Sequence, residues 1–432
     1  MYLAERGPDQ AAESGDPSPG SAVRPGRAVR AVPTTVLALG TVSLITDVSS
    51  EMVAAVLPLY LVAGLGLSPL GFGLLDGVYN GVSGLVRLFG GHLADRGGRH
   101  KAVALAGYGL SALCKPLLLL AHTLPAIGAV LALDRAGKGL RTAPRDALIS
   151  LSTPPETRGR AFGVHRAMDT GGALLGPLAA FLVLGVAAEG YDAVFTVSFC
   201  AAALGVLVLV LFVPSRPTGL DTRPAAARDG AAGGAPPVTL RSAVALLGRP
   251  EVRRLAVCAA LLGLTTVSDA FVYLMLRHRL GIAEQWFPLL PLGTAVVFLL
   301  LALPLGVLAD RVGRRRVFLA GHLALLAAYG LLLAAPAGPV VPFAVLALHG
   351  AFYAATDGVL AAAAAGAVPA ELRASGLALI GTGQALARFC CSIAVGAAWT
   401  ALGDRAVLQA AMAGLALCAA WAAYALRGRE AR

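Results

Sequence analysis

Charged residues are scarce in this sequence. Asp, Glu, Lys and Arg together make up 14% of the 432 residues, whereas soluble domains carry about 25%. Hydrophobic residues account for 57% of the chain, and the mean hydropathy is +0.75. This composition excludes a water-soluble globule and indicates a chain that lies mostly inside a membrane.

The sequence also has few cysteines, few aromatic residues and no short motif of a common enzyme class. The six cysteines all lie in apolar stretches without metal-ligand spacing, so we expect buried small hydrophobes. No GxSxG, GxxxxGK[ST] or HExxH pattern occurs. Aromatic residues, at 6%, are too sparse to predict an aromatic cage for flat cations. We therefore expect no enzyme, no cofactor and no metal site.

What the sequence does contain is a series of long apolar runs separated by Gly, Pro and charge clusters, which predict twelve transmembrane helices. The expected ranges are 34–62, 70–94, 102–121, 125–149, 161–187 and 192–213 in the first half, and 252–276, 287–309, 316–335, 339–365, 375–401 and 405–426 in the second. The predicted organisation is a disordered cytoplasmic tail (1–33), a six-helix bundle (34–213), a cytoplasmic linker (214–250), a second six-helix bundle (251–426) and a short tail (427–432).

The basic excess of +11 is distributed unevenly along the chain. Arginine and lysine cluster before the first helix, after the second, fourth and eighth helices, in the linker and at the C-terminus. All of these positions fall on one side of a twelve-helix arrangement, and such an excess marks the cytoplasmic side. We expect a multi-pass protein of the inner (plasma) membrane with both termini in the cytoplasm, and no nucleic-acid partner.

An internal repeat divides the chain at the same place. The segment GGHLADRGGRHK (90–101) returns as LGVLADRVGRRR (305–316), which places Asp95 and Asp310 215 residues apart. PPETRGRA (154–161) returns as VPAELRAS (368–375), and Glu156 and Glu371 are again 215 apart. Transporters are commonly built from such repeats, with the substrate site between them.

These loop segments resemble the signature between helices 2 and 3 of the major facilitator superfamily, and the resemblance covers about residues 34–426. It implies an all-α membrane protein with twelve transmembrane helices in two pseudo-symmetric six-helix bundles. The stretches TDVSSEM (46–52) and GKGLRTAPRDALIS (137–150) also resemble a bacterial, efflux-like subgroup of uncharacterised transporters. The signature residues are Gly91, Asp95, Arg96, Gly98 and Arg99, and in the second copy Asp310, Arg311, Gly313 and Arg314.

A carboxylate at the end of the second helix could cap a neighbouring helix and pair with an arginine, which would latch the cytoplasmic side. The alternative is a topology and folding element without a gating role. In the fifth helix, Gly163, Gly172, Gly176 and Pro177 resemble the signature associated with antiporters, although Ala180-Phe181 replaces its final glycine pair.

The fourth helix carries a stripe of charge. Asp134, Arg135, Lys138, Arg141, Arg145 and Asp146 fall within an arc of about 140° on a helical wheel. A stripe of this kind must face protein or water, because exposure of charge to lipid is costly. We expect Arg135, Lys138 and Arg141 to bind an anionic part of the substrate, and structural ion pairs are the alternative. Lys138 replaces the Gln of the family's Arg-x-x-Gln-Gly pattern.

Acids inside the membrane are candidate proton carriers, because a carboxylate there must be paired or protonated. Asp47 and Glu51 share a face of the first helix, and Asp269 is comparable in the second half. They are also natural partners for the basic stripe, so static salt bridges are the alternative. Tyr353 and Asp357 form a second polar spot in the tenth helix and are further candidates for substrate binding.

The sequence thus predicts a secondary transporter that works by alternating access. Proton-coupled export of a small organic solute or drug is the main hypothesis. Organic-anion uptake or exchange is the second, and a non-transporting membrane sensor is the third. The expected partners are a small-molecule substrate, protons and membrane lipids, and the expected state is a monomer.

Overall fold

The structure is a computed structural model. It describes residues 32–95, 99–154, 157–187, 190–214, 246–334, 338–356 and 373–425, with side chains except at 83–85, 87–95, 251 and 373–378. Within these ranges every regular element is a helix and no strand occurs. The two terminal tails and most of the linker fall outside the described residues, as do Arg96, Gly98 and Asp357.

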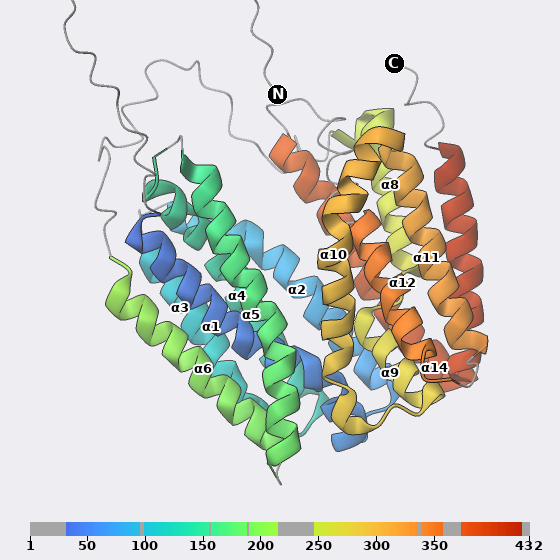
Figure 1. Cartoon of the computed structure of the whole chain (residues 1–432), viewed down its shortest axis with the longest axis horizontal. Coiled ribbons are helices and arrows are strands. Elements are labelled where there is room, and N and C mark those ends of the chain that lie inside the picture. The colour runs from blue at the N-terminus through green and yellow to red at the C-terminus, as the bar shows by residue number, and fades with distance from the viewer. Residues whose placement is uncertain are drawn as a thin grey trace, which may run out of the picture. The chain divides into compact units, whose positions relative to one another are not determined.

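The first repeat consists of six long helices, close to the ranges expected from hydropathy (Figure 1). They are α1 (Thr34–Leu59), α2 (Pro69–Asp95), α3 (His100–Leu120), α4 (Leu124–Leu151), α5 (Arg158–Val186) and α6 (Gly190–Phe212). A π-helical turn, Tyr60–Gly64, extends α1. Helix α1 packs against α5 and α6, whereas α4 packs against α2 and α3.

The second repeat departs from the sequence prediction in its first helix. Its elements are η4 (Leu246–Gly248), α8 (Pro250–Thr265), α9 (Asp269–Leu280), η5 (Glu284–Trp286), α10 (Leu289–Val312), α11 (Arg314–Ala334), α12 (Val341–Thr356) and α14 (Arg373–Ala425). The helix expected over 252–276 is broken between α8 and α9. The two last helices agree with the expected ranges 375–401 and 405–426: they are the two parts of α14, which meet at a kink at Gly403, where φ is 84° and favours glycine.

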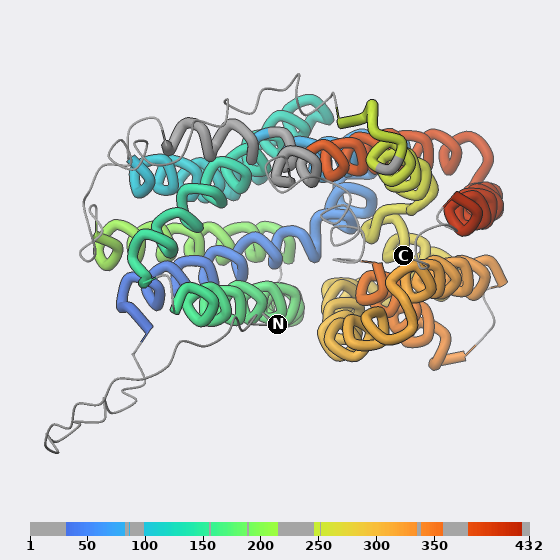
Figure 2. The backbone as a smooth tube through the Cα atoms, turned by 90° about the horizontal axis from the view of Figure 1, so that it is seen from above, coloured from blue at the N-terminus to red at the C-terminus, as the bar shows by residue number. Residues whose placement is uncertain are grey.

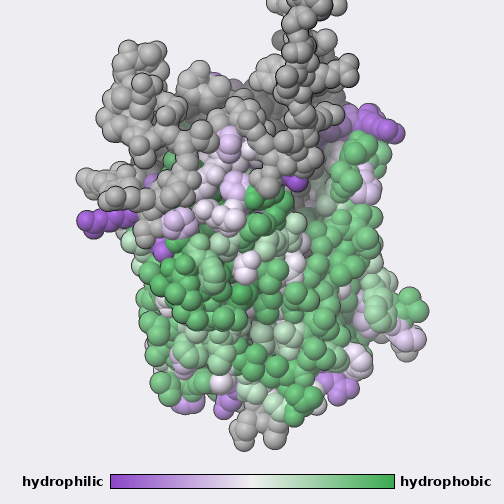
Figure 3. All heavy atoms as spheres, turned by 60° about the vertical axis from the view of Figure 1, so that its left-hand side comes forward, coloured by the Kyte–Doolittle hydropathy of each residue, from purple (hydrophilic) through white to green (hydrophobic). Residues whose placement is uncertain are grey.

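Eight of the described helical segments are long and apolar enough to cross a membrane. Figure 3 shows a broad apolar face, and large hydrophobic side chains of α5 and α6 are exposed there rather than buried. Examples are Leu182, Val186, Leu204, Leu207 and Leu211. Because exposed apolar surface on this scale is not stable in water, these helices face lipid.

Close helix packing depends on glycine at a few contacts. A Cβ on Gly172 of α5 would collide with the Leu44 carbonyl oxygen of α1. Gly73 of α2 and Gly396 of α14 likewise meet the backbone of the opposite helix. This second contact joins the two repeats, and both helices lie together when seen from above (Figure 2).

The internal repeat has a structural counterpart at the ends of two helices. Lys101, at the start of α3, donates hydrogen bonds from Nζ to the carbonyl oxygens of Val210 (3.0 Å) and Val213 (2.5 Å), at the end of α6. Arg315, at the start of α11, donates from Nη2 to the carbonyl oxygen of Ala423 (2.5 Å), near the end of α14. In both repeats a basic residue of the loop signature thus satisfies carbonyl groups at a helix C-terminus.

Candidate functional site

A cavity of about 430 Å³ lies between the two repeats, a size typical of small-molecule sites. Residues of α1, α2, α4 and α5 line it from the first repeat, and residues 266–270, α10, α12 and α14 line it from the second. The charged side chains among the described lining residues are three carboxylates, Glu51, Asp76 and Asp269, and one guanidinium, Arg388.

Aromatic side chains gather around this cavity although the chain as a whole has few of them. The lining includes Phe72, Tyr79, Tyr273, Phe298 and Tyr353. Overall composition did not predict this local concentration, because composition contains no information on which helix faces meet. An aromatic and acidic wall favours a flat or cationic ligand.

The break between α8 and α9 opens backbone toward the cavity. Residues 266–268 lie between the two helices and line the cavity. The amide of Val267 donates a 2.9 Å hydrogen bond to Tyr329 Oη, and the Thr266 carbonyl accepts one from Cys391 Sγ at 3.4 Å. Non-helical backbone inside a membrane is tolerated where protein groups satisfy it in this way. The break places Asp269 in the first turn of α9.

Asp269 is the centre of a polar cluster in the second repeat. Tyr353 Oη donates a 2.5 Å hydrogen bond to Asp269 Oδ1, and His349 Nε2 lies 3.4 Å from the same oxygen. The side chain of Asp269 is 45% exposed, whereas that of His349 is fully buried. The structure thus brings together Asp269 and Tyr353, which were predicted in separate roles. Sequence reasoning missed His349, although it precedes Tyr353 by one helical turn.

Asp76 is a second cavity carboxylate that the sequence did not assign to the site. It is buried on α2, accepts a 3.2 Å hydrogen bond from Asn80 Nδ2, and accepts a 2.6 Å bond from Ser392 Oγ of α14. No cationic partner lies within 4 Å of its carboxylate among the described residues. The signal available in the sequence was only an acid in an apolar run.

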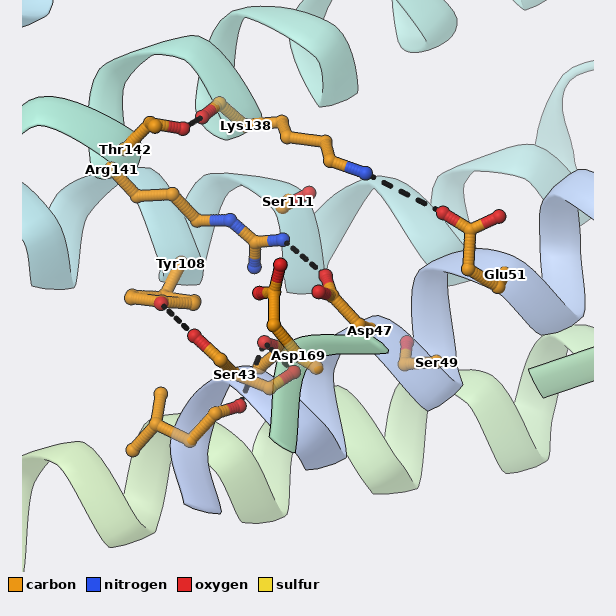
Figure 4. Close-up of polar contacts among 12 residues, drawn as sticks. Ser43, Asp47, Ser49, Glu51, Tyr108, Ser111, Lys138, Arg141, Thr142 and Asp169 are labelled. Carbon is orange, nitrogen blue, oxygen red and sulfur yellow. Dashed lines mark hydrogen bonds and ion pairs between the residues drawn. The ribbon is translucent and has the colours of Figure 1, made fainter. Parts of the chain in front are cut away.

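The charged stripe of α4 faces α1, as Figure 4 shows. Arg141 Nη2 lies 3.2 Å from Asp47 Oδ1, and Lys138 Nζ lies 3.5 Å from Glu51 Oε1. The Arg141 guanidinium also lies over the Tyr108 ring, 4.4 Å from its centroid. The Arg141 pair is almost fully buried, whereas both side chains of the Lys138 pair are about one-third exposed.

The Asp169 side chain lies near that of Asp47 (Figure 4), and Arg145 Nη1 lies 3.4 Å from Asp169 Oδ1. Asp169 extends from α5 toward α1 between these groups (Figure 4). Each of the two neighbouring carboxyls therefore has an arginine of α4 as a partner.

Arg135 belongs to a separate buried cluster. Asp134 pairs with Arg135 and, at 2.8 Å, with Lys115 Nζ, and it accepts a 2.6 Å hydrogen bond from Ser111 Oγ. The Arg135 guanidinium lies 4.0 Å from the Tyr79 ring centroid. None of the three basic residues predicted to bind substrate is among the described residues that line the cavity, and each has an acidic partner.

The structure describes only part of the loop signature at 90–101 and its second copy at 305–316. Helix α2 ends at Asp95, Arg99 precedes α3 and is exposed, and Gly91 lies among the side-chain positions outside the description. In the second copy, Arg314 Nη2 lies 3.4 Å from Asp310 Oδ1, with Arg311 exposed and Gly313 at φ 97° between α10 and α11. This is an exposed ion pair across a turn.

The residues of the fifth-helix signature have different surroundings on α5. Gly172 and Gly176 pack against the α1 backbone, and Pro177 lines the cavity. No atom of the described residues lies within 4 Å of a Cβ built on Gly163. The signature therefore reaches the cavity only at its C-terminal end.

A chain whose described elements are all helical, with lipid-facing helices and a central cavity between two repeats, is a multi-pass membrane transporter. The sequence profile of the Major Facilitator Superfamily matches residues 39–389, and the chain belongs to this superfamily. It is a secondary transporter of a small-molecule substrate, not an enzyme.

Relatives agree with this assignment. The chain is 30% identical over 294 residues to an uncharacterised MFS-type transporter of Methanocaldococcus jannaschii, which covers 66% of this chain and 68% of the relative. It is 36% identical over 174 residues, 40% of each chain, to an uncharacterised protein of Mycobacterium tuberculosis.

Solved structures with the same fold are more distant in sequence. The nucleoside transporter NupG gives a TM-score of 0.76 at 14% identity and covers 91% of this chain and 99% of its own. A bacterial homologue of the human lysosomal transporter Spinster, in an inward-facing conformation, gives 0.72 at 16% identity, with coverage of 94% and 97%. Peptide transporter POT in complex with sulfate gives 0.70 at 16%, with coverage of 91% and 95%.

Proposed function

We propose that this protein exports a small organic solute in exchange for protons, by alternating access of the central cavity to the two sides of the membrane. The observation that carries the proposal is the cavity lining, in which three carboxylates face a space for a small molecule and one arginine accompanies them. A carboxylate at membrane depth that is reached from a cavity can bind a proton or a solute and release it elsewhere.

The environments of the acids support a role in proton exchange. Glu51 and Asp269 are 30% and 45% exposed in their side chains, so protons can reach both from the cavity. Each carboxylate also has a basic partner that can balance its negative charge when the solute leaves. This partner is Lys138 for Glu51 and His349 for Asp269. Asp47 is buried against Arg141 and does not line the cavity, so we assign it a supporting role behind Glu51 on the same helix.

The packing of α5 supports exchange rather than uptake. Gly172 and Gly176 bring α5 against the segment of α1 that carries Asp47 and Glu51. Pro177 follows directly and contributes to the cavity wall. A shift of α5 would therefore change the surroundings of the proton-binding face of α1 and the shape of the cavity together.

Organic-anion transport is the second candidate, and Arg388 is the observation that favours it. Arg388 lines the cavity, and its Nε is buried without a hydrogen-bond partner in the described part of the chain. A buried cationic group of this kind is satisfied by an anion or by water. The basic stripe of α4 lends this candidate less support, because its side chains are paired with acids.

We also propose the membrane arrangement that the charge distribution implies. The chain lies in the inner membrane as a monomer, with both termini and the segment between the six-helix halves in the cytoplasm. The loop signatures then lie at the cytoplasmic ends of α2 and α10, where the exposed Asp310–Arg314 pair can open and close at little cost.

The proposal is tested by proton movement in proteoliposomes that carry an imposed pH gradient. The probes are N-methyl-4-phenylpyridinium, a permanent cation, and 4-phenylbenzoate, an anion of similar shape. We expect the cation to dissipate the gradient with wild-type protein and not with Asp269→Asn. Asp192→Asn, which removes an exposed acid outside the cavity lining, is the matched control and should behave as wild type. A response to the anion alone would overturn export and favour the second candidate.

A further inference from the structure

His349 occupies an unusual position for an ionisable side chain. It lies on α12 with none of its surface exposed, one helical turn before Tyr353. Neither ring nitrogen makes a hydrogen bond to a described residue. Its one close acidic neighbour there is Asp269, whose Oδ1 lies 3.4 Å from Nε2. A buried imidazole in this setting can become a positively charged imidazolium only while the Asp269 carboxylate is negatively charged and is not paired with another cation.

The remaining groups around His349 do not replace Asp269. Tyr273 of α9 and Tyr353 of α12 face the ring at centroid distances of 6.1 and 5.3 Å, and Tyr353 directs its hydroxyl to Asp269. His322 of α11 is separated from it by Phe352, and α10 brings Thr294, which is not titratable. Arg388 of α14 adds a positive charge. Asp269 is therefore the group that decides whether the imidazolium is stable.

The side chain of Asp269 contacts both protein groups and the cavity. Its carboxylate contacts His349 and Tyr353 on the protein side, and it lines the cavity with 45% of its side chain exposed. The cavity wall around it contains aromatic rings and two further carboxylates, a lining suited to an organic cation. A cation bound there would use the same negative charge that the protonated His349 requires.

We propose that His349 is the group that carries the exchanged proton and that the substrate is an organic cation which competes with that proton for Asp269. This inference rests on the proposed exchange of solute for protons. The imidazolium of His349, the Asp269 carboxylate and the incoming cation become neutral His349, a cation–Asp269 pair and one released proton. The proton leaves from Nε2 through Asp269 to water in the cavity, and total charge is conserved. The Asp269 carboxylate can stabilise either the His349 imidazolium or the bound cation. The protein therefore holds either the proton or the cation, which is the condition for exchange.

Binding of N-methyl-4-phenylpyridinium to the purified full-length protein in detergent tests this proposal. This cation has no proton of its own, so every proton released on binding comes from the protein. Calorimetric titrations in buffers of different ionisation enthalpy, from about pH 5.5 to about pH 8.5 where histidine ordinarily titrates, give the number released. We expect a maximum close to one proton per bound cation, and an affinity that weakens by up to about tenfold per pH unit toward acid pH.

The variants separate His349 from the other titratable groups. His349→Gln should still bind the cation, but proton release should fall to less than about one-fifth and the affinity should become nearly independent of pH. His322→Gln changes another buried histidine of the same repeat, one that does not contact Asp269, and should keep the wild-type release. Asp269→Asn should weaken cation binding by at least about tenfold.

Several outcomes would overturn the proposal. If the wild-type protein binds the cation without releasing protons, the proposal is overturned. This outcome does not depend on whether His349→Gln folds. Equal proton release by wild type and His349→Gln would place the proton on a carboxylate instead. Binding of 4-phenylbenzoate but not of the cation would exclude the substrate class. Proton release on binding, together with no dissipation of the gradient in proteoliposomes, would overturn the proposed export but leave His349 as the proton carrier.

Discussion

Ser392 of α14 donates a 2.6 Å hydrogen bond to Oδ2 of Asp76 on α2, and this bond joins the two repeats at the wall of the cavity. It lies beside the close contact of Gly73 with the Ser392 carbonyl and is followed one turn on by Gly396 against Pro69. In the described part of the chain the carboxylate of Asp76 has no ion-pair partner and accepts hydrogen bonds from Asn80 Nδ2 and Ser392 Oγ. The bond from Ser392 is therefore both a junction of the repeats and a stabiliser of a buried acid.

Removal of the Ser392 hydroxyl should lower stability measurably. Ser392→Ala leaves one oxygen of Asp76 without its donor, which costs roughly 1.5–3 kcal/mol when the acceptor is charged. Chemical unfolding of the purified protein in mixed micelles measures this change. Ser152→Ala is the matched control, because the Ser152 hydroxyl is buried and has no hydrogen-bond partner among the described residues, so its loss should change the free energy of unfolding by less than about 0.5 kcal/mol. Equal effects of the two substitutions would contradict the role of the Ser392–Asp76 bond.

The Asp134 cluster should behave as a structural element. Asp134→Asn leaves Lys115 and Arg135 as two buried cations without their shared carboxylate. We expect a loss of about 3–5 kcal/mol in the free energy of unfolding, or no folded protein at all. Asp146→Asn on the same helix removes an acid that is 43% exposed, and it should change that free energy by less than about 1 kcal/mol. Folded, stable Asp134→Asn protein would show that Arg135 does not depend on this pair.

The charged stripe shows what the sequence could and could not predict. Helical periodicity placed the charges of α4 on one face and required that face to be covered. It could not specify which acid would meet which base, because that depends on the depth at which α1 and α4 cross. Glu51 meets Lys138, as the sequence allowed, whereas Arg135 pairs with its neighbour Asp134, which also pairs with Lys115 of α3.

The broken helix shows a second limit. Residues 252–276 are mostly apolar, and no Gly or Pro marks the break at 266–268. The break is compensated by Tyr329 and Cys391, which lie on other helices and far away in sequence. A single-sequence pattern contains no such tertiary partner, so the start of α9 at Asp269 and its contact with His349 could not be predicted. The twelve apolar runs and the internal repeat, in contrast, were sufficient to predict the fold class.

Lys138 distinguishes the two candidate functions. Its pair with Glu51 is 3.5 Å long and partly exposed, so Lys138→Gln should change the free energy of unfolding by less than about 1 kcal/mol. We expect proton flux driven by N-methyl-4-phenylpyridinium to persist within about threefold, since a pair worth so little changes rates only slightly. The proteoliposome assay described above measures this flux. Loss of flux in Lys138→Gln, with recovery in Lys138→Arg, would show that a cation is required there and would favour anion transport.

The glycines of α5 should differ sharply in their tolerance of alanine. A Cβ at Gly172 meets the backbone of Leu44 on α1, and backbone cannot rotate away as a flexible side chain would. Gly172→Ala should therefore separate α5 from α1 and cost about 1–3 kcal/mol in the free energy of unfolding.

Gly163→Ala is the matched control for this prediction, because at that position of the same helix a Cβ would meet no atom of the described ranges. Alanine favours helix over glycine by up to about 1 kcal/mol, so Gly163→Ala should leave the protein as stable as wild type or slightly more stable. Both variants are compared by unfolding in mixed micelles and by cation-driven proton flux. If Gly172→Ala keeps full stability but loses flux, the contact serves the movement of α5 rather than its packing. If both variants behave as wild type, the close approach of α5 to α1 is not required for either.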